Sequence, residues 1–364
     1  MEITINRDLL LASILQASRF TSSRIGSSAG LQGILFINKE KRLHLYSTDL
    51  NTFFHTSIYS SEEGESRFLL DTRKAVEFLT YLAPGDIVIH IEKDKITILQ
   101  KKSKGSFAFL SGADFPTPPS ASKESQKIEV KTFEKIISLV LFSASKDPSR
   151  PVLSGVNFVE KEGELDVVST DGFRLSLFHI KNELHLKSSL VPAEFLLELS
   201  RNIKEKKEIS ISYLDEEKMV FFKAENDEYT TRLIEGDFPP YERVIPTEKK
   251  TTVTLDRDDL MRNVKLISVF ARDFSNIIIC RFSKDGLTLS PKTEGGVENS
   301  TTQDCEFEGE EMKVAFNFKF LIDFLNSTDN EKISFELLRP DAPVVLRTKE
   351  KNYTHIIMPV RIQE

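Results

Sequence analysis

The stretch Ile3-Thr-Ile-Asn-Arg-Asp-Leu-Leu10 decides the fold, because a strand-like alternation that leads into a helix occurs three times in the chain. Its counterparts are Ile128-Glu-Val-Lys-Thr-Phe-Glu-Lys135 and Val253-Thr-Leu-Asp-Arg-Asp-Asp-Leu260. The copies start at positions 3, 128 and 253, so both intervals are 125 residues. A fixed interval indicates a repeated structural unit, and this interval is far too long for a solenoid. We therefore expect three copies of one domain, each with its own core.

Other landmarks keep nearly the same spacing. A second set of three stretches starts at positions 43, 165 and 287, at equal intervals of 122. They are Leu43-His-Leu-Tyr-Ser-Thr-Asp49, Leu165-Asp-Val-Val-Ser-Thr-Asp171 and Leu287-Thr-Leu-Ser-Pro-Lys-Thr293. Each copy then continues with a second helix, a pair of alternating strands and a proline-bearing strand. We predict the second helices at 71–82, 192–203 and 317–326, the strand pairs at 87–99, 209–222 and 333–346, and the last strands at 114–116, 237–241 and 358–360.

The helical segments carry apolar residues at helical spacing. In the second copy these are Phe133, Ile136, Ile137, Val140 and Leu141, and the first copy offers Leu11, Ile14 and Leu15. Two helices and several antiparallel strands in each copy predict an α+β domain. The polar stretch 118–126 and the segment 246–250 are typical of linkers. The predicted domains are therefore 1–122, 127–246 and 247–364.

Composition excludes several classes of protein. The chain of 364 residues is 40% hydrophobic and 29% charged, and no apolar run approaches the roughly 20 residues of a membrane span. The N-terminus lacks the apolar core of a signal peptide, so we expect a cytoplasmic protein. Cys280 and Cys305 suit neither a disulfide framework nor a zinc site, and we expect no metal and no cofactor. The net charge of −7 requires any DNA-binding face to be local.

An enzyme is one alternative to a binding protein. Asp49 and Asp171 both follow Ser-Thr, but the third copy has Pro291-Lys-Thr293 at this place, without the acid. No phosphate-binding loop, HExxH motif or nucleophile elbow occurs in the sequence. We expect the two aspartates to accept backbone hydrogen bonds in turns. A monomeric scaffold that binds proteins but not DNA is the other alternative.

Three motifs stand at fixed places on the repeat: Ser169-Thr-Asp-Gly-Phe-Arg-Leu175, Gly236-Asp-Phe-Pro-Pro-Tyr-Glu-Arg-Val-Ile-Pro246 and Met358-Pro-Val-Arg-Ile362. With them, the chain from residue 1 to 362 resembles the beta subunit of bacterial DNA polymerase III. The resemblance implies a DNA sliding clamp in which two subunits join head to tail as a homodimeric ring of six domains. It implies duplex DNA, bound without sequence preference, as one partner. The other implied partners are the DNA polymerase III alpha subunit, the clamp-loader complex, other polymerases and repair proteins.

The resemblance also assigns residues. For DNA contacts it favours Arg24 and Arg73, then Lys146 and Arg150, and helical position adds Arg201, Lys204, Arg262 and Lys265. An apolar pocket for partner peptides of the type Gln-Leu-x-Leu-Phe would comprise Leu153, Thr170, Gly172, Phe173, Arg174, Leu175, Pro239, Arg243, Val244, Pro343, Ile356, Met358, Pro359, Val360 and Arg361. The dimer interface would join Lys74, Phe107 and Phe109, with strand 106–110, to Val269 and Phe270.

The chain departs from the family pattern around the implied pocket. Phe173 stands where the family more often has His, Val152 replaces an aromatic residue, and Pro343 replaces a small polar one. The chain also extends past the usual end by Gln363 and Glu364. These differences predict a pocket with a shifted peptide preference.

Overall fold

The computed structural model describes residues 1–22, 28–110, 115–116, 119, 124–272, 275–292 and 299–361. The chain divides into two compact units, of which the first comprises Met1–Thr132 and Leu197–Leu233. The second comprises Phe133–Leu196 and Ile234–Glu364. Each unit therefore holds one outer copy of the repeat and part of the central copy.

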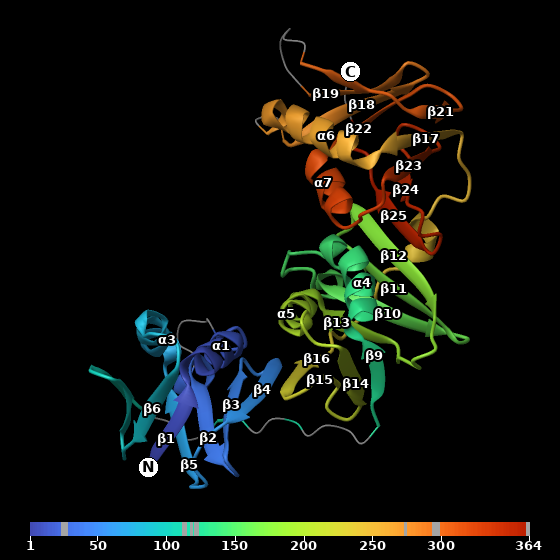
Figure 1. Cartoon of the computed structure of the whole chain (residues 1–364). Helices are drawn as coiled ribbons and strands as arrows, with labels where there is room; N and C mark the ends of the chain where they lie inside the picture. Colours follow the sequence, from blue (N-terminus) through green and yellow to red (C-terminus); the bar gives the residue numbers. More distant parts are fainter. Residues whose placement is uncertain are drawn as a thin grey trace. The chain divides into compact units, whose positions relative to one another are not determined.

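The first unit contains two antiparallel sheets (Figure 1). The four-stranded sheet has the order β1 (Glu2–Asn6), β6 (Asp86–Ile91), β7 (Lys95–Gln100) and β8 (Ser103–Ala108). The eight-stranded sheet has the order β5 (Ser66–Leu70), β2 (Ile34–Lys39), β3 (Arg42–Thr48), β4 (Thr52–Tyr59), β16 (Asp227–Arg232), β15 (Met219–Ala224), β14 (Glu208–Leu214) and β9 (Gln126–Glu129). Its first four strands belong to the first copy and its last four to the second.

The second unit has the same plan. Its nine-stranded sheet has the order β13 (Ser189–Pro192), β10 (Gly155–Lys161), β11 (Glu164–Thr170), β12 (Arg174–Lys181), β25 (Tyr353–Ile357), β24 (Val344–Arg347), β23 (Lys332–Leu337), β17 (Thr251–Asp256) and β21 (Glu306–Glu308). Its four-stranded sheet has the order β20 (Thr301–Gln303), β19 (Gly286–Pro291), β18 (Ile277–Ser283) and β22 (Met312–Asn317).

The helices of the described residues confirm the two predicted for each copy, and the short α2 is an additional helix that was not predicted. They are α1 (Arg7–Ser18), α2 (Ala29–Gln32), α3 (Thr72–Tyr81), α4 (Val130–Val140), α5 (Ala193–Ile203), α6 (Arg257–Ala271) and α7 (Phe318–Asn326). Asn6, Asp71, Asp256 and Asn317 each accept a hydrogen bond from a backbone N–H of the first turn. Such N-caps stop the preceding extended segment and start the helix, which explains why a strand leads directly into a helix in the first and third copies.

One antiparallel pairing joins the first and second copies, and we call it the first seam: β4 with β16. Phe54 lies opposite Tyr229 there, and their rings are 5.2 Å apart. Phe20, which follows α1, stacks on Phe54 at 5.2 Å, and Gln16 of α1 donates a 2.6 Å hydrogen bond to the Tyr229 hydroxyl. Aromatic packing and a satisfied hydroxyl therefore make this seam part of the core of the first unit.

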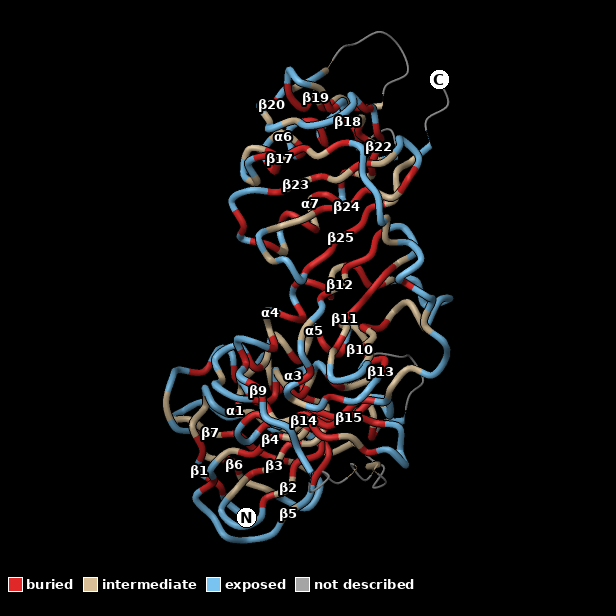
Figure 2. The backbone as a smooth tube through the Cα atoms, turned by 90° about the vertical axis from the view of Figure 1, so that its right-hand side faces the viewer, coloured by how far each residue is buried: buried red, intermediate tan, exposed pale blue. Residues whose placement is uncertain are grey.

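The second seam pairs β12 with β25, so it joins the second and third copies. Ser176 lies opposite His355, and its hydroxyl is 2.8 Å from His355 Nδ1. His355 is fully buried, and burial lowers the pKa of its imidazole well below the usual range. Figure 2 shows β11, β12 and β25 as a mostly buried stretch of backbone. Two seams therefore connect three copies through continuous sheets.

An arginine recurs at the first residue of α1 and of α6. Arg7 donates to the backbone oxygen of Leu82, just after α3, and Arg257 donates from Nη2 to Leu325 O of α7 at 2.6 Å. The last carbonyl groups of a helix lack partners within the helix, so both guanidinium groups satisfy acceptors that would otherwise be left open. The repeated arginine thus ties the two helices of each outer copy together.

Two expectations were wrong in detail. Helix α1 buries Leu10, Ile14 and Ala17, whereas Leu15 is 44% exposed. Its sequence is apolar on two adjacent faces, so helical periodicity alone could not select the buried one. The proline-bearing segments are also not strands where they are described, at 115–116, 237–240 and 358–360. Proline has no N–H to donate to a sheet, which explains why the ladders end before these segments.

Candidate functional site

A cavity of about 140 Å³ lies in the second unit. Four segments line it. Two are the 3-10 helix Pro151–Ser154 and the turn that connects β11 to β12. The others are the end of β25 with the residue that follows it, and the 3-10 helix Tyr241–Val244 with the two prolines before it. The lining residues are Leu153, Thr170, Gly172, Arg174, Leu175, Pro239, Pro240, Tyr241, Val244, Ile356 and Met358. Apolar side chains with a few polar groups are typical of a binding pocket.

The base of the cavity belongs to a buried apolar cluster. Leu175 and Ile356 lie opposite each other across the second seam and are 4% and 1% exposed. Val168, Tyr241 and Val345 complete this cluster. The second seam therefore holds the cavity on a rigid sheet, and a rigid support keeps the lining residues in place without a ligand.

One wall is fixed by Tyr241, which is 5% exposed. Its hydroxyl donates a 2.6 Å hydrogen bond to Oδ2 of Asp166 on β11. Burial and the neighbouring carboxylate raise the pKa of the Tyr241 phenol, so it remains a donor at neutral pH. The Lys161 ammonium lies 5.6 Å from the centre of the Tyr241 ring and pairs with Glu242 at 2.6 Å.

The β11–β12 turn owes its shape to Asp171. Its Oδ1 accepts hydrogen bonds from the backbone N–H groups of Phe173 at 2.9 Å and Arg174 at 3.0 Å. Gly172 has a φ of +90°, a conformation that costs glycine little. Asp49 accepts from Asn51 N at 3.0 Å and Thr52 N at 2.7 Å in the first copy. These bonds confirm that both aspartates serve backbone donors in turns.

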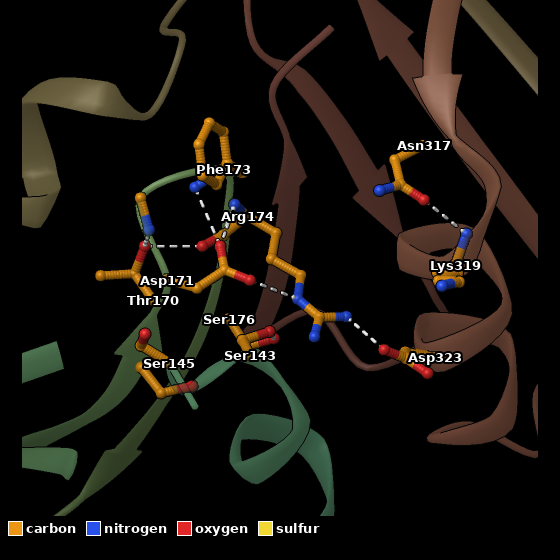
Figure 3. Close-up of polar contacts among 12 residues, drawn as sticks. Ser143, Ser145, Thr170, Asp171, Phe173, Arg174, Ser176, Asn317, Lys319 and Asp323 are labelled. Carbon is orange, nitrogen blue, oxygen red and sulfur yellow. Dashed lines mark hydrogen bonds and ion pairs between the residues drawn. The ribbon is translucent and has the colours of Figure 1, made fainter. Parts of the chain in front are cut away.

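Arg174 occupies the most connected polar position of the cavity (Figure 3). Its Nε donates to Asp171 Oδ2 at 3.0 Å, and its Nη1 donates to Asp323 Oδ2 of α7 at 2.6 Å. The guanidinium carbon lies 4.7 Å from the centre of the Phe320 ring and 5.6 Å from that of Phe142. Two carboxylates and two aromatic rings therefore fix a side chain that is only 8% exposed.

The cavity contains much of the predicted pocket but not all of it. The predicted residues that line it are Leu153, Thr170, Gly172, Arg174, Leu175, Pro239, Val244, Ile356 and Met358. The remaining predicted residues are not in its lining: Phe173, Arg243, Pro343, Pro359, Val360 and Arg361. Phe173 is 57% exposed on the neighbouring turn. Pro240 and Tyr241 were missed, although both lie within the motif 236–246, because only the tertiary fold shows which of its residues face inward.

The predicted DNA-contacting cations are exposed wherever they are described. Arg24 lies outside the described residues. Arg73, Arg201 and Lys204 belong to the first unit, and Lys146, Arg150, Arg262 and Lys265 to the second. Several have acidic neighbours: Arg73 pairs with Asp71 at 2.7 Å, Arg201 with Glu198 at 2.6 Å and Arg262 with Asp259 at 2.5 Å. The hydrogen bond from Arg73 lowers the pKa of the Asp71 carboxyl.

The predicted interface residues lie at the last strand of a sheet or on an exposed helix face. Strand β8 carries Phe107, whose ring meets Phe78 at 5.7 Å, and it ends at Ala108, two residues before the predicted limit. Phe109 stacks on Phe68 at 5.2 Å, and Lys74 of α3 is exposed. On α6, Val269 and Phe270 are 57% and 41% exposed. Exposed apolar side chains, as on α6, and an unpaired sheet edge, as at β8, are each typical of an association surface.

Within the described part of the chain, no helix is long and apolar enough to cross a membrane. The same residues contain no group of three or more histidine, cysteine, aspartate or glutamate side chains placed to hold a metal ion.

Comparison with known proteins covers the whole chain. Three family models match in succession: the N-terminal domain of the DNA polymerase III beta subunit over residues 1–119, its central domain over 127–240 and its C-terminal domain over 242–361. The beta sliding clamp of Staphylococcus aureus is 26% identical over 379 residues, with 99% of each chain covered. That of Halalkalibacterium halodurans is 28% identical over 386 residues, with 99% of this chain and 100% of its own covered.

Solved structures share the fold. The DNA polymerase III beta subunit of Thermotoga maritima matches with a TM-score of 0.90 at 24% identity, with 100% of both chains covered. The beta subunit from the DNA polymerase of Streptococcus pyogenes matches with a TM-score of 0.91 at 20% identity, again with 100% coverage of both chains.

Proposed function

Because the chain belongs to the DNA polymerase III beta subunit family, we infer that it is a DNA sliding clamp. Members of this family are processivity factors that encircle duplex DNA, and they are not enzymes. We propose that residues 1–122, 127–246 and 247–364 form its three domains. The equal intervals of the sequence repeat support this division.

The pattern of seams is the observation that best supports a ring-shaped assembly. Three copies form two seams within one chain, β4 with β16 and β12 with β25. In the repeat, β8 of the first copy is equivalent to β16 and β25, and β20 of the third copy is equivalent to β4 and β12. These equivalent strands pair across the two seams, whereas β8 and β20 are each the terminal strand of their sheet. We therefore propose that the third seam forms with a second chain. Two chains that pair β8 with β20 head to tail close a ring of six domains with no free terminal strand at this position.

Light scattering tests the dimer. We expect a mass of twice the 41.5 kDa of one chain at micromolar concentration. Phe270→Arg should shift the protein to monomers, because a charge would replace an apolar contact at the proposed interface of Lys74, Phe107, Phe109, Val269 and Phe270. Arg281→Ala, an exposed change elsewhere in the third copy, should remain dimeric. A monomer for the unaltered chain would favour the scaffold alternative.

We propose that the cavity binds short apolar peptides of partner proteins, namely the DNA polymerase III alpha subunit, the clamp loader, other polymerases and repair proteins. Apolar lining and the flexible Met358 side chain suit leucine and phenylalanine side chains. Phe173, Arg243, Pro343, Pro359, Val360 and Arg361 would contact the parts of a peptide outside the cavity. Met358→Ala and Arg174→Ala should each weaken binding of a Gln-Leu-x-Leu-Phe peptide without changing the mass of the dimer. Unchanged affinity in both would contradict the pocket.

DNA would be held by phosphate contacts from Arg24, Arg73, Lys146, Arg150, Arg201, Lys204, Arg262 and Lys265. Such contacts carry no base information and therefore permit sliding. With a net charge of −7, retention on DNA should depend on the closed ring more than on affinity. Such a protein works in the cytoplasm, where bacterial DNA is replicated.

A further inference from the structure

We propose that Asp323 is a positioning residue for peptide binding: it orients the Arg174 guanidinium so that its remaining N–H groups donate to a carbonyl oxygen of the bound peptide. This inference rests on the proposed peptide-binding function of the cavity. Asp323 itself is not in the lining of the cavity, whereas Arg174 is. The aspartate therefore acts on the ligand through the arginine.

The hydrogen bonds of Arg174 show how this works. Nε is engaged by Asp171 and Nη1 by Asp323, and no described residue accepts a hydrogen bond from Nη2. The Phe320 and Phe142 rings restrict the guanidinium plane, at 4.7 and 5.6 Å from its carbon. A planar donor fork held at two of its nitrogens presents the third in a fixed direction. A peptide carbonyl is a suitable acceptor, because Asp171 and Asp323 already outweigh the single positive charge.

The exposure of the two partners separates this role from a purely structural one. The Arg174 side chain is 8% exposed and the Asp171 side chain is 16% exposed. The ion pair with Asp171 is therefore the one that keeps the buried charge of Arg174 from being unpaired. Asp323 is 43% exposed, and ion pairs at such exposure contribute little to stability. Loss of Asp323 should therefore leave Arg174 paired and the second unit folded. Without Asp323, the Arg174 guanidinium would lose the acceptor of Nη1 and could turn to a different direction.

Fluorescence anisotropy with a labelled Gln-Leu-Ser-Leu-Phe peptide tests the proposal on the full-length dimer. Asp323→Ala should raise Kd about threefold to tenfold, the cost of ordering one side chain that was previously fixed. Asp323→Glu should restore affinity to within about twofold, because it returns an acceptor for Nη1. Asp329→Ala is the matched control, since Asp329 is an exposed aspartate just beyond α7, and it should not change Kd.

A double-mutant cycle gives the decisive readout. If Asp323 acts through Arg174, then Asp323→Ala has no further effect on Kd in the Arg174→Ala background. An equal effect in both backgrounds, or an unchanged Kd for Asp323→Ala alone, would overturn the proposal. If Asp323→Ala lowers the melting temperature, Asp323→Leu, which keeps the side-chain volume but has no acceptor, replaces it in the same cycle with the same two outcomes. Failure of the unaltered protein to bind the peptide would instead refute the proposed pocket.

Discussion

Tyr241 and Asp166 are joined by a 2.6 Å hydrogen bond from the phenol to Oδ2, which fastens one wall of the cavity to β11. The other oxygen of Asp166 lies 2.6 Å from His179 Nδ1, which donates to it. The carboxylate therefore keeps a second partner if the phenol is removed. The tyrosine bond links the motif 236–246 to the sheet on which the cavity rests.

Tyr241→Phe should lower the free energy of unfolding by about 1 kcal/mol, the usual net value of one buried hydrogen bond. The ring and its apolar contacts remain, so the fold should be unchanged. Urea unfolding followed by circular dichroism measures the difference. Tyr81→Phe is the control, because Tyr81 is 83% exposed. Equal midpoints for both variants would show that the Asp166 bond does not stabilise the wall.

Arg257→Ala should destabilise the third copy, because the Leu325 carbonyl loses donors at 3.1 and 2.6 Å. Bonds that involve a charged group contribute about 1.5–3 kcal/mol, so a clear decrease in melting temperature is expected. Arg262→Ala, an exposed change on the same helix, should have little effect. Indistinguishable melting temperatures would argue against the arginine as a tie between α6 and α7.

The first seam should lose stability in acid. Burial raises the pKa of the Glu228 carboxyl, but hydrogen bonds from His55 and Lys223 outweigh this effect and hold the pKa at about 2, below the ordinary value of 4.5. A lowered pKa contributes stability that is complete above pH 4.5 and disappears as pH falls through about 2. Glu228→Gln should be less stable at pH 7, and its deficit should shrink toward pH 2. A deficit that stays constant with pH would contradict this assignment.

The loop 146–150 should contribute to DNA affinity through charge alone. Lys146→Glu with Arg150→Glu should weaken binding to linear duplex DNA. The variant should also show a smaller slope of log affinity against log salt, by about 1 for each phosphate group that the loop no longer binds. Lys349→Glu with Lys351→Glu is the matched control, since both lysines are exposed in the turn between β24 and β25. Equal slopes for the two double variants would exclude Lys146 and Arg150 as phosphate-binding residues.

Local chemistry explains what the sequence could predict. The N-caps Asp71 and Asn317 are the first residues of the helices predicted at 71–82 and 317–326. Asp49 and Asp171 act on residues two and three positions away. Interactions of this range are visible in a sequence. The equal intervals of the repeat then transfer each local prediction from one copy to the next.

Long-range partners could not be predicted in the same way. Tyr241 meets Asp166 from 75 residues away, and Arg174 meets Asp323 from 149 residues away. Neither pair has a spacing rule, because strand order and the second seam bring the residues together. The buried face of α1 was missed for a different reason, since Leu10 and Leu11 are equally apolar. The places of Phe173 and Arg361 outside the cavity lining likewise depend on tertiary structure.

The central claim is that the protein holds DNA by encircling it, and retention on circular versus linear DNA tests this most directly. The clamp should be loaded on nicked circular DNA by a clamp loader, and gel filtration should separate bound from free protein. We predict retention on the circle, release after the circle is cut once, and retention on cut DNA whose ends are blocked by bound protein. Equal retention on circular and unblocked linear DNA would contradict the account.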